Sequence, residues 1–134
     1  MLEVDWRLYL ASDQPGYFEI CALDPELAAH LSASTMAVFI DRPYANKILK
    51  KHNFLVEQLS SMKMTIERGV AIADKDRHVT FFYKNSAKQY FKASIKVTRN
   101  LDEIFLCTFH KIRAEEFQRK MRQLANKPLL REGK

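Results

Sequence analysis

The 134-residue chain has little glycine, proline or cysteine. Three glycines and four prolines are too few for a disordered or loop-rich protein. Apolar stretches such as residues 36–40 and 79–83 are far too short to cross a bilayer. The first five residues carry two acids and no basic charge, which argues against a secretory signal peptide. We therefore expect a cytoplasmic protein that does not associate with membranes.

Sequence signatures of metal, cofactor and hydrolase sites are also lacking. Cys21 and Cys107 lie far apart and have no C-x-x-C or paired Cys/His spacing, which favours two buried thiols in a reducing compartment over a disulfide or a zinc site. There is no P-loop, Rossmann glycine pattern, H-E-x-x-H, G-x-S-x-G or EF-hand loop. Asp74 and Asp76 fit a turn better than a two-metal nuclease site. The sequence therefore predicts neither a metal nor a cofactor.

Positive charge is abundant and unevenly distributed. The chain has 22 Lys and Arg against 16 Asp and Glu, a net charge of +6. Arg7 is the only Lys or Arg before position 42, so the acidic N-terminal third and the basic remainder are expected to present different faces. An excess of cations suits a polyanionic partner such as RNA or DNA, or an acidic protein. We expect one domain over residues 1–134, made of an acidic N-terminal extension (1–35), a core (36–112) and a C-terminal helix with its tail (113–134).

The first half of the chain predicts short strands followed by helices. Residues 4–11 and 17–23 are typical of two strands joined by a turn at 12–16. Asp24-Pro25-Glu26 predicts the start of a short helix that runs to about Ala33. Residues 35–40 fit either a strand or the approach to a helix.

The second half of the chain changes from helical to alternating periodicity. Asp41-Arg42-Pro43 begins a helix over about 43–52, and a second helix over about 54–66 ends at Gly69, which is expected to be a left-handed cap. Antiparallel strands are expected at 70–73, 79–84, 89–98 and 103–110, then a helix at about 113–125 and a frayed end from Asn126. These elements predict an α+β fold, with N-terminal helices packed on a three- to four-stranded twisted antiparallel sheet and a C-terminal helix.

Two strands carry the candidate chemistry. Alternation over 89–98 directs one set of side chains into the core (Phe91, Ala93, Ile95, Val97) and the other away from it (Tyr90, Lys92, Ser94, Lys96, Thr98). On the next strand, alternation separates Phe105, Cys107 and Phe109 from Ile104, Leu106, Thr108 and His110. A hairpin through 99–102 brings Lys92 opposite Phe109 or His110, and Lys96 opposite Phe105.

Lysine, hydroxyl and histidine side chains on one sheet face suit the hydrolysis of RNA. Lys92 and Lys96 can neutralise a phosphate and its transition state, and His110 can move a proton near neutral pH. RNA supplies its own nucleophile, the 2′-OH. The same pattern also fits a solvated polar face, and Lys can protect an edge strand. His52 fits a helix C-terminal histidine on the dipole, and His30 and His78 fit structural or surface roles.

The order of these features resembles the barnase–EndoU–colicin–RelE-like nuclease superfamily. The resemblance covers about residues 36–112: a helix that ends in Lys51-His52, a second that closes on Gly69, and strands with F-F-Y, Y-F-K-A-S-I-K-V-T and E-I-F-L-C-T-F-H. The similarity is greatest to those members of the superfamily that are associated with phages and polymorphic toxins. It implies a sheet whose concave face cuts RNA, often tRNA or mRNA, without metal, leaving a 2′,3′-cyclic phosphate. It also implies a cognate immunity or antitoxin protein.

The resemblance implies a role for each candidate residue. His52 would be the helix-borne acid or base and Lys92 the lysine on the scissile phosphate, supported by Lys96. Thr108 and His110 would be the polar residues of the last strand. The sequence thus predicts a metal-independent endoribonuclease of the toxin type.

Two other functions stay open. One is a non-catalytic RNA- or DNA-binding module, with Tyr90, Phe82 and Tyr83 as stacking residues. The other is a phage- or secretion-associated adaptor that docks through its acidic N-terminal third.

Overall fold

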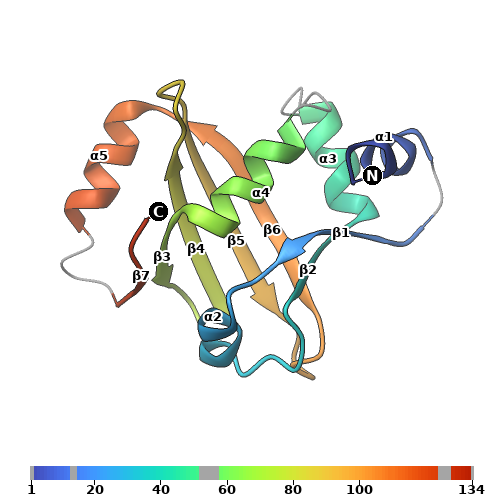
Figure 1. The fold of residues 1–134 in the computed structure, drawn as a ribbon, viewed down its shortest axis with the longest axis horizontal. Helices are drawn as coiled ribbons and strands as arrows, with labels where there is room; N and C mark the ends of the chain where they lie inside the picture. Colours follow the sequence, from blue (N-terminus) through green and yellow to red (C-terminus); the bar gives the residue numbers. More distant parts are fainter. Residues whose placement is uncertain (1, 13–14, 52–57, 124–127, 134) are drawn as a thin grey trace.

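The computed structural model describes residues 2–12, 15–51, 58–123 and 128–133, and within them the fold is α+β. Its helices and strands follow one another in this order: α1 (Leu2–Ala11), β1 (Tyr17–Ala22), α2 (Pro25–His30), β2 (Ala37–Asp41), α3 (Arg42–Lys51), α4 (Gln58–Arg68), β3 (Val70–Ala73), β4 (His78–Lys84), β5 (Tyr90–Val97), β6 (Ile104–Ile112), α5 (Ala114–Gln123) and β7 (Leu129–Arg131). Figure 1 shows this arrangement.

The strands form one seven-stranded sheet in the order β1-β2-β6-β5-β4-β3-β7. The predicted antiparallel strands are its central four, β3 to β6. The prediction of only three or four strands is wrong, because β1, β2 and β7 extend the sheet at both ends. β2 pairs in parallel with β6, which makes the sheet mixed.

The predicted strand at residues 4–11 is wrong, since this segment is helix α1. Alternation would bury Val4 and Leu8 beside Trp6, yet they are 50% and 66% exposed, while Trp6 is 2% exposed. Trp6 and Tyr9 share a helical face and pack on Phe18, with ring centroids 5.2 and 5.4 Å away. Aromatic burial at a three-residue spacing therefore decides in favour of the helix.

Four local predictions meet different outcomes. Asp24 occupies the N-cap position of α2 without a side-chain cap hydrogen bond, and the Tyr44 amide donates to the Asp41 side chain at 2.9 Å, which confirms the predicted start of α3. The open choice at 35–40 resolves to β2, which runs directly into α3. The left-handed cap at Gly69 is wrong, because positive φ among the described glycines occurs at Gly16. A Cβ on Gly69 would lie 2.5 Å from the Thr65 carbonyl oxygen, so close backbone approach is what requires glycine there.

Helices cover the two sheet faces unequally. α4 crosses one face, where Met62 and Ile66 are buried in the main core with Phe91 and Ile95 of β5 (Figure 1). On the other face α5 contributes Phe117 to a smaller cluster, which also contains Met121, Ile72, Phe82, Ile112, Val70 and Tyr90. The inward positions predicted for Phe117 and Met121 are confirmed, and Leu124 lies outside the described residues. α5 thus covers one end of its face.

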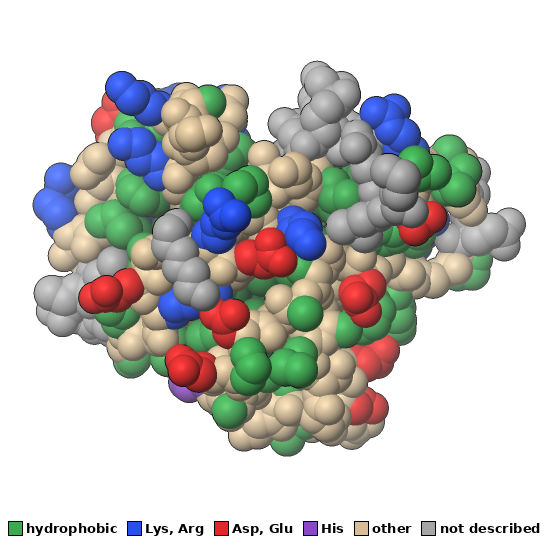
Figure 2. Space-filling view, viewed as in Figure 1, with side chains coloured by type: hydrophobic (Ala, Val, Ile, Leu, Met, Phe, Trp, Pro, Cys, Tyr) green, Lys and Arg blue, Asp and Glu red, His purple; other side chains and the backbone are tan. Residues whose placement is uncertain are grey.

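The α4 side carries charges of both signs. Figure 2 shows Lys or Arg beside Asp or Glu near its centre, and acidic side chains predominate around α2, β1 and β2. On α4, Lys63 and Glu67 form an exposed ion pair at 3.5 Å. The described residues include no helix long and apolar enough to cross a membrane.

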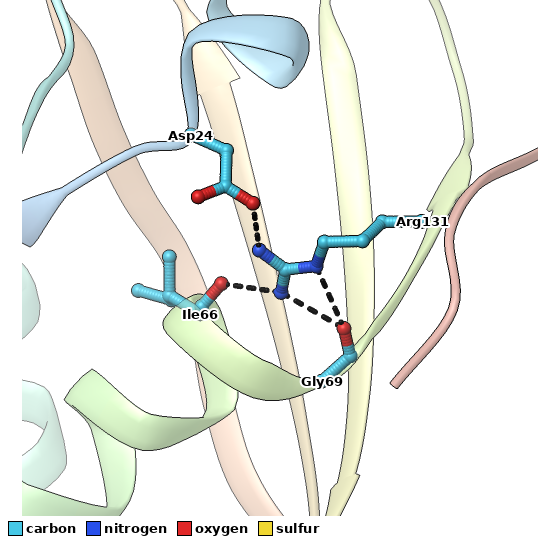
Figure 3. Close-up of polar contacts among 4 residues, drawn as sticks. All are labelled: Asp24, Ile66, Gly69 and Arg131. Carbon is cyan, nitrogen blue, oxygen red and sulfur yellow. Dashed lines mark hydrogen bonds and ion pairs between the residues drawn. The ribbon is translucent and has the colours of Figure 1, made fainter. Parts of the chain in front are cut away.

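The predicted frayed end is wrong for residues 129–131, which form β7 and pair with β3. Arg131 anchors this strand, as Figure 3 shows. Its guanidinium donates to the carbonyl oxygens of Ile66 and Gly69 at 2.7 and 2.8 Å, and to the Asp24 carboxylate at 2.7 Å. The end of α4, the start of α2 and the last strand are therefore joined by one side chain.

Candidate nucleic-acid interface

The candidate residues of β5 and β6 meet across the strands. Lys92 lies opposite His110, Ser94 opposite Thr108, and Lys96 opposite Phe105. Both predicted pairings of the lysines are confirmed. Both pairings can occur in the same hairpin because the register shifts by one residue on β6 between Thr108 and Leu106.

The same irregularity corrects the predicted faces of β6. Phe109 is buried in the main core, but so are Ile104 and Leu106, which simple alternation places on the opposite side. The extra residue, Cys107, resets the alternation, so Phe105 shares a face with Thr108 and His110. A β-bulge leaves little trace in the sequence, and periodicity could not locate it.

We call the polar surface across β4, β5 and β6 the open face, and its members are exposed or half-exposed: His78, Lys92, Ser94, Lys96, Thr108 and His110. The Thr108 hydroxyl donates to the Ser94 hydroxyl at 3.1 Å. Thr80 of β4 pairs with Ser94 in register, and its hydroxyl donates to the Asp74 carboxylate at 2.8 Å. Hydroxyl groups therefore occupy the middle of the open face, with a Lys–His pair on one side of them.

His78 joins the open face although its sequence neighbours give no sign of it. It lies opposite Lys96, and its Nδ1 is 2.7 Å from the Asp76 carbonyl oxygen. A carbonyl oxygen can only accept, so Nδ1 carries the proton and Nε2 of the neutral ring is an acceptor. Only the β4–β5 register, which the sequence does not show, brings His78 to the lysines.

The other predicted site residues do not all converge. Lys92 and Lys96 are four residues apart on β5, which separates their Cα atoms by about 13 Å. They are therefore suited to different phosphates of one chain rather than to the same phosphate. His52 lies outside the described residues, so its position relative to Lys92 is untested.

A basic groove adjoins the Lys92–His110 end of the open face. It has a volume of about 940 Å³, and β6 and α5 line it with His110, Lys111, Ile112, Arg113, Glu115, Glu116, Arg119 and Arg122. Cations outnumber the two carboxylates. Lys92 and Lys120 line a smaller cleft of about 50 Å³ beside α5. The cations form a continuation of the open face that suits a phosphate backbone.

The other end of the open face contains a second cavity of about 530 Å³. Lys96, Arg77 and Arg99 line it together with Phe105, Asp41, Tyr44, Thr98, Leu106 and Cys107. Burial raises the pKa of the Cys107 thiol, an effect that nearby Lys96 partly offsets. The Cys107 thiol is therefore neutral at physiological pH and is a poor nucleophile.

Tyr44 holds the edge of β6 beside this cavity. Its hydroxyl accepts a hydrogen bond from the Phe109 amide at 2.5 Å. Phe109 lies beyond Phe105, the last residue of β6 that is paired with β2. Burial raises the pKa of Tyr44 to about 12. A side chain thus takes the place of a neighbouring strand next to Thr108 and His110.

The predicted stacking aromatics are not the accessible ones. Phe82 is 3% exposed, and Tyr90 packs on Phe117 of α5 with ring centroids 4.8 Å apart. Tyr83 packs against the main core. The exposed aromatic surface lies instead at the β1–β2–β6 end, where Tyr17 meets Phe105 edge to face at 4.8 Å and Phe39 lies 6.5 Å from Phe105.

Both cysteines are free thiols, with Cys21 buried and Cys107 half-buried. In the part of the chain that the structure describes, no group of three or more His, Cys, Asp or Glu could hold a metal ion. No known protein family, curated protein or solved structure matches the chain.

Proposed function

We propose that this protein is an endoribonuclease that cleaves RNA on its open face by attack of the 2′-OH. The observation that carries the proposal is the cross-strand pair of Lys92 and His110 beside the hydrogen-bonded hydroxyls of Ser94 and Thr108. Facing residues on neighbouring strands have Cβ atoms about 5 Å apart, so both side chains can reach one phosphodiester. The resemblance of residues 36–112 to the toxin-type nucleases supports the same activity.

Lys92 and His110 divide the reaction between them. The His110 imidazole removes the proton of the 2′-OH, and the 2′-oxygen then bonds to phosphorus while the bond to the 5′-oxygen breaks. The Lys92 ammonium stabilises the extra negative charge on the phosphorus centre and assists the departing 5′-oxygen. The products are a 2′,3′-cyclic phosphate and a 5′-hydroxyl. The departing 5′-oxygen takes its proton from the Lys92 ammonium or from His52, which lies outside the described residues.

The surrounding cations guide the rest of the RNA. Arg113, Arg119 and Arg122 lie along the groove at the Lys92–His110 end, and Lys96 lies toward the other end. Each cation that contacts a phosphate releases a condensed counterion, so binding should weaken steeply as salt rises.

A non-catalytic single-strand-binding module is the second candidate. It is favoured by the aromatic surface of Tyr17, Phe39 and Phe105, which lies on the same side of the sheet as the lysines. Aromatic rings beside cations suit base stacking without any chemistry.

The decisive experiment is incubation of the purified protein with total RNA in EDTA. Wild type is compared with Lys92→Ala, His110→Ala and His52→Ala, and with Arg68→Ala as a control that removes one exposed cation from the end of α4. We expect cleavage by wild type and the control, with 5′-hydroxyl and cyclic phosphate ends. Lys92→Ala should lower the rate by roughly 10² or more.

Three results would contradict the proposal. If Lys92→Ala and His110→Ala cleave as wild type does, the site is elsewhere. If wild type binds RNA but does not cleave it at high protein and low salt, the single-strand-binding module is favoured. If wild type does not bind RNA at any salt concentration, the adaptor is favoured.

A further inference from the structure

The cavity at the Lys96 end of the open face is not used by the proposed reaction. Its volume of about 530 Å³ falls within the range of small-ligand sites. Lys92 and His110 line other clefts, beside α5. The cavity is therefore available to a different part of a ligand from the part that Lys92 and His110 bind.

Its lining combines two kinds of chemistry. Lys96, Arg77 and Arg99 supply three cations, and Phe105 supplies an aromatic ring. Tyr17 does not line the cavity but packs on Phe105, with ring centroids 4.8 Å apart. Lys96 and Phe105 are directly opposite each other across β5 and β6, so a cation and a ring are neighbours. Tyr17 is 55% exposed. A ligand with one anionic group and one flat apolar group matches this juxtaposition.

The turn between β3 and β4 places Arg77 at the cavity. Arg77 has a left-handed φ of 64°, a conformation that residues other than glycine rarely adopt. Its carbonyl accepts from the Val97 amide at 3.0 Å, and the amide of the next residue, His78, donates to the Lys75 carbonyl at 3.0 Å.

The carboxylate of Asp41 determines how a ligand is oriented in the cavity. It lines the same cavity and one of its oxygens accepts from the Tyr44 amide. A phosphate is repelled by Asp41 and attracted by Lys96, Arg77 and Arg99, whereas a base can stack on Phe105 near Asp41.

We propose that this cavity binds one unpaired nucleotide of the RNA substrate, with its base on Phe105 and Tyr17 and its phosphate on Lys96, Arg77 and Arg99. The proposal rests on the proposed function and deepens it: the substrate is single-stranded at a position about 13 Å from the cleaved bond, the separation of Lys96 from Lys92 along β5. A paired base is already stacked and cannot reach Phe105, so duplexes are excluded from this cavity.

The test measures binding separately from cleavage. The probe is a short fluorescent 2′-O-methyl RNA, whose blocked 2′-oxygen cannot attack, and binding is followed by anisotropy for the single strand and for its duplex. The variants are Phe105→Leu, which keeps the apolar volume but removes the ring, and Arg99→Ala. Tyr17→Ala is the second ring variant, because an exposed side chain can be removed without unfolding the sheet. Arg68→Ala is the matched charge control.

We expect Phe105→Leu to weaken single-strand binding roughly tenfold with an unchanged salt dependence. Arg99→Ala should weaken binding and lower the slope of log K against log salt by about 1. Tyr17→Ala should act like Phe105→Leu but less strongly. The control should bind as wild type does, and none of the ring variants should affect the duplex.

The outcomes separate this proposal from the ribonuclease assignment. If Phe105→Leu and Tyr17→Ala bind single strands like wild type, or weaken the duplex equally, the nucleotide site is wrong even if RNA is cleaved. If the ring variants weaken single-strand binding selectively while wild type cleaves no RNA, the nucleotide site stands and the ribonuclease is wrong. No binding by wild type would overturn both.

Discussion

The Arg131 guanidinium lies 2.7 Å from the Asp24 carboxylate, which is 107 positions earlier in the chain. The Arg131 side chain is only 9% exposed, and its hydrogen-bond acceptors also include two backbone carbonyls at the end of α4. The stability of the sheet edge at β7 thus depends on one planar group with several donors.

Arg131→Met should lower the free energy of unfolding by about 2–4 kcal/mol, because the carbonyls of Ile66 and Gly69 lose a charged donor. Arg131→Lys keeps the charge but cannot reach three acceptors at once, so it should recover only part of the loss. Asp24→Asn should cost less, since Asp24 is 36% exposed. Urea denaturation measures all three, and equal stability of Arg131→Met and wild type would show that Arg131 anchors nothing.

Gly69→Ala should destabilise the protein by about 3 kcal/mol. The added Cβ would lie 2.5 Å from the Thr65 carbonyl oxygen and 2.9 Å from that of Phe82, and neither backbone atom can move without shifting α4 or β4. Gly133→Ala is the control, because its nearest neighbour is the Val70 side chain at 3.3 Å. Thermal or urea unfolding should leave Gly133→Ala close to wild type. A stable Gly69→Ala would mean that α4 and β4 are farther apart.

Local signals in the sequence predicted the central part of the fold. The period of two from Val70 onward gives β3 to β6, and Asp41 before Pro43 gives the start of α3. Residues 4–11 could not be assigned in this way, because their apolar spacing fits both periods and only packing on Phe18 selects the helix. β7 is three residues long, and its pairing with β3 is a long-range contact without a local pattern.

The candidate site was predictable to the extent that a hairpin defines it. Pairing through the 99–102 turn gives Lys96 opposite Phe105, and the bulge at Cys107 moves His110 opposite Lys92. His78 could not be found, since it reaches the open face only through β4–β5 pairing. The parallel β2–β6 pair, which brings Asp41 to the cavity at the Lys96 end of the open face, is equally non-local.

Tyr44→Phe should destabilise the edge of β6 by about 1–2 kcal/mol, because the Phe109 amide loses the hydroxyl that accepts from it. The effect should be local, so the Phe109 amide should exchange with solvent faster than its neighbours in β5. Tyr17→Phe provides the control for removing an exposed phenol hydroxyl. Unchanged exchange at Phe109 would mean that the bond adds no protection.

Stability should fall above pH 9 because of the buried Cys21 thiol. Burial, assisted by Glu67, raises the pKa of Cys21 to about 12 from 9.0. The native state thus keeps a proton that the unfolded chain loses, so this stabilisation is complete below pH 9 and is lost as the pH rises toward 12, with a limiting slope of about 1.4 kcal/mol per pH unit.

Cys21→Ala should abolish this part of the pH dependence, although the cavity lowers stability at every pH. Urea unfolding of wild type and variant at pH 7, 9 and 10 gives the slope of stability against pH for each protein. Taking the difference between the two slopes cancels the titration of lysines and tyrosines, which both proteins share. Parallel curves for the two proteins would mean that the thiol titrates normally. In the folded protein Cys21 should also resist alkylation at pH 8 and react once urea unfolds it.

Lys92→Ala and Lys96→Ala should differ in kind, although both residues lie on one strand and one face. Lys92 is opposite His110 and is assigned to the transition state, so its loss should lower kcat by roughly 10² and leave KM nearly unchanged. Lys96 lies about 13 Å away and lines the nucleotide cavity, so its loss should raise KM a few-fold with kcat nearly unchanged. Steady-state cleavage of a fluorogenic oligoribonucleotide separates the two parameters. Because both substitutions remove the same charge from the same strand, a general effect of net charge would move KM equally in both. Equal losses of kcat would instead place both lysines at one phosphate, and the sheet would then have to bend far more sharply than the β5–β6 register allows.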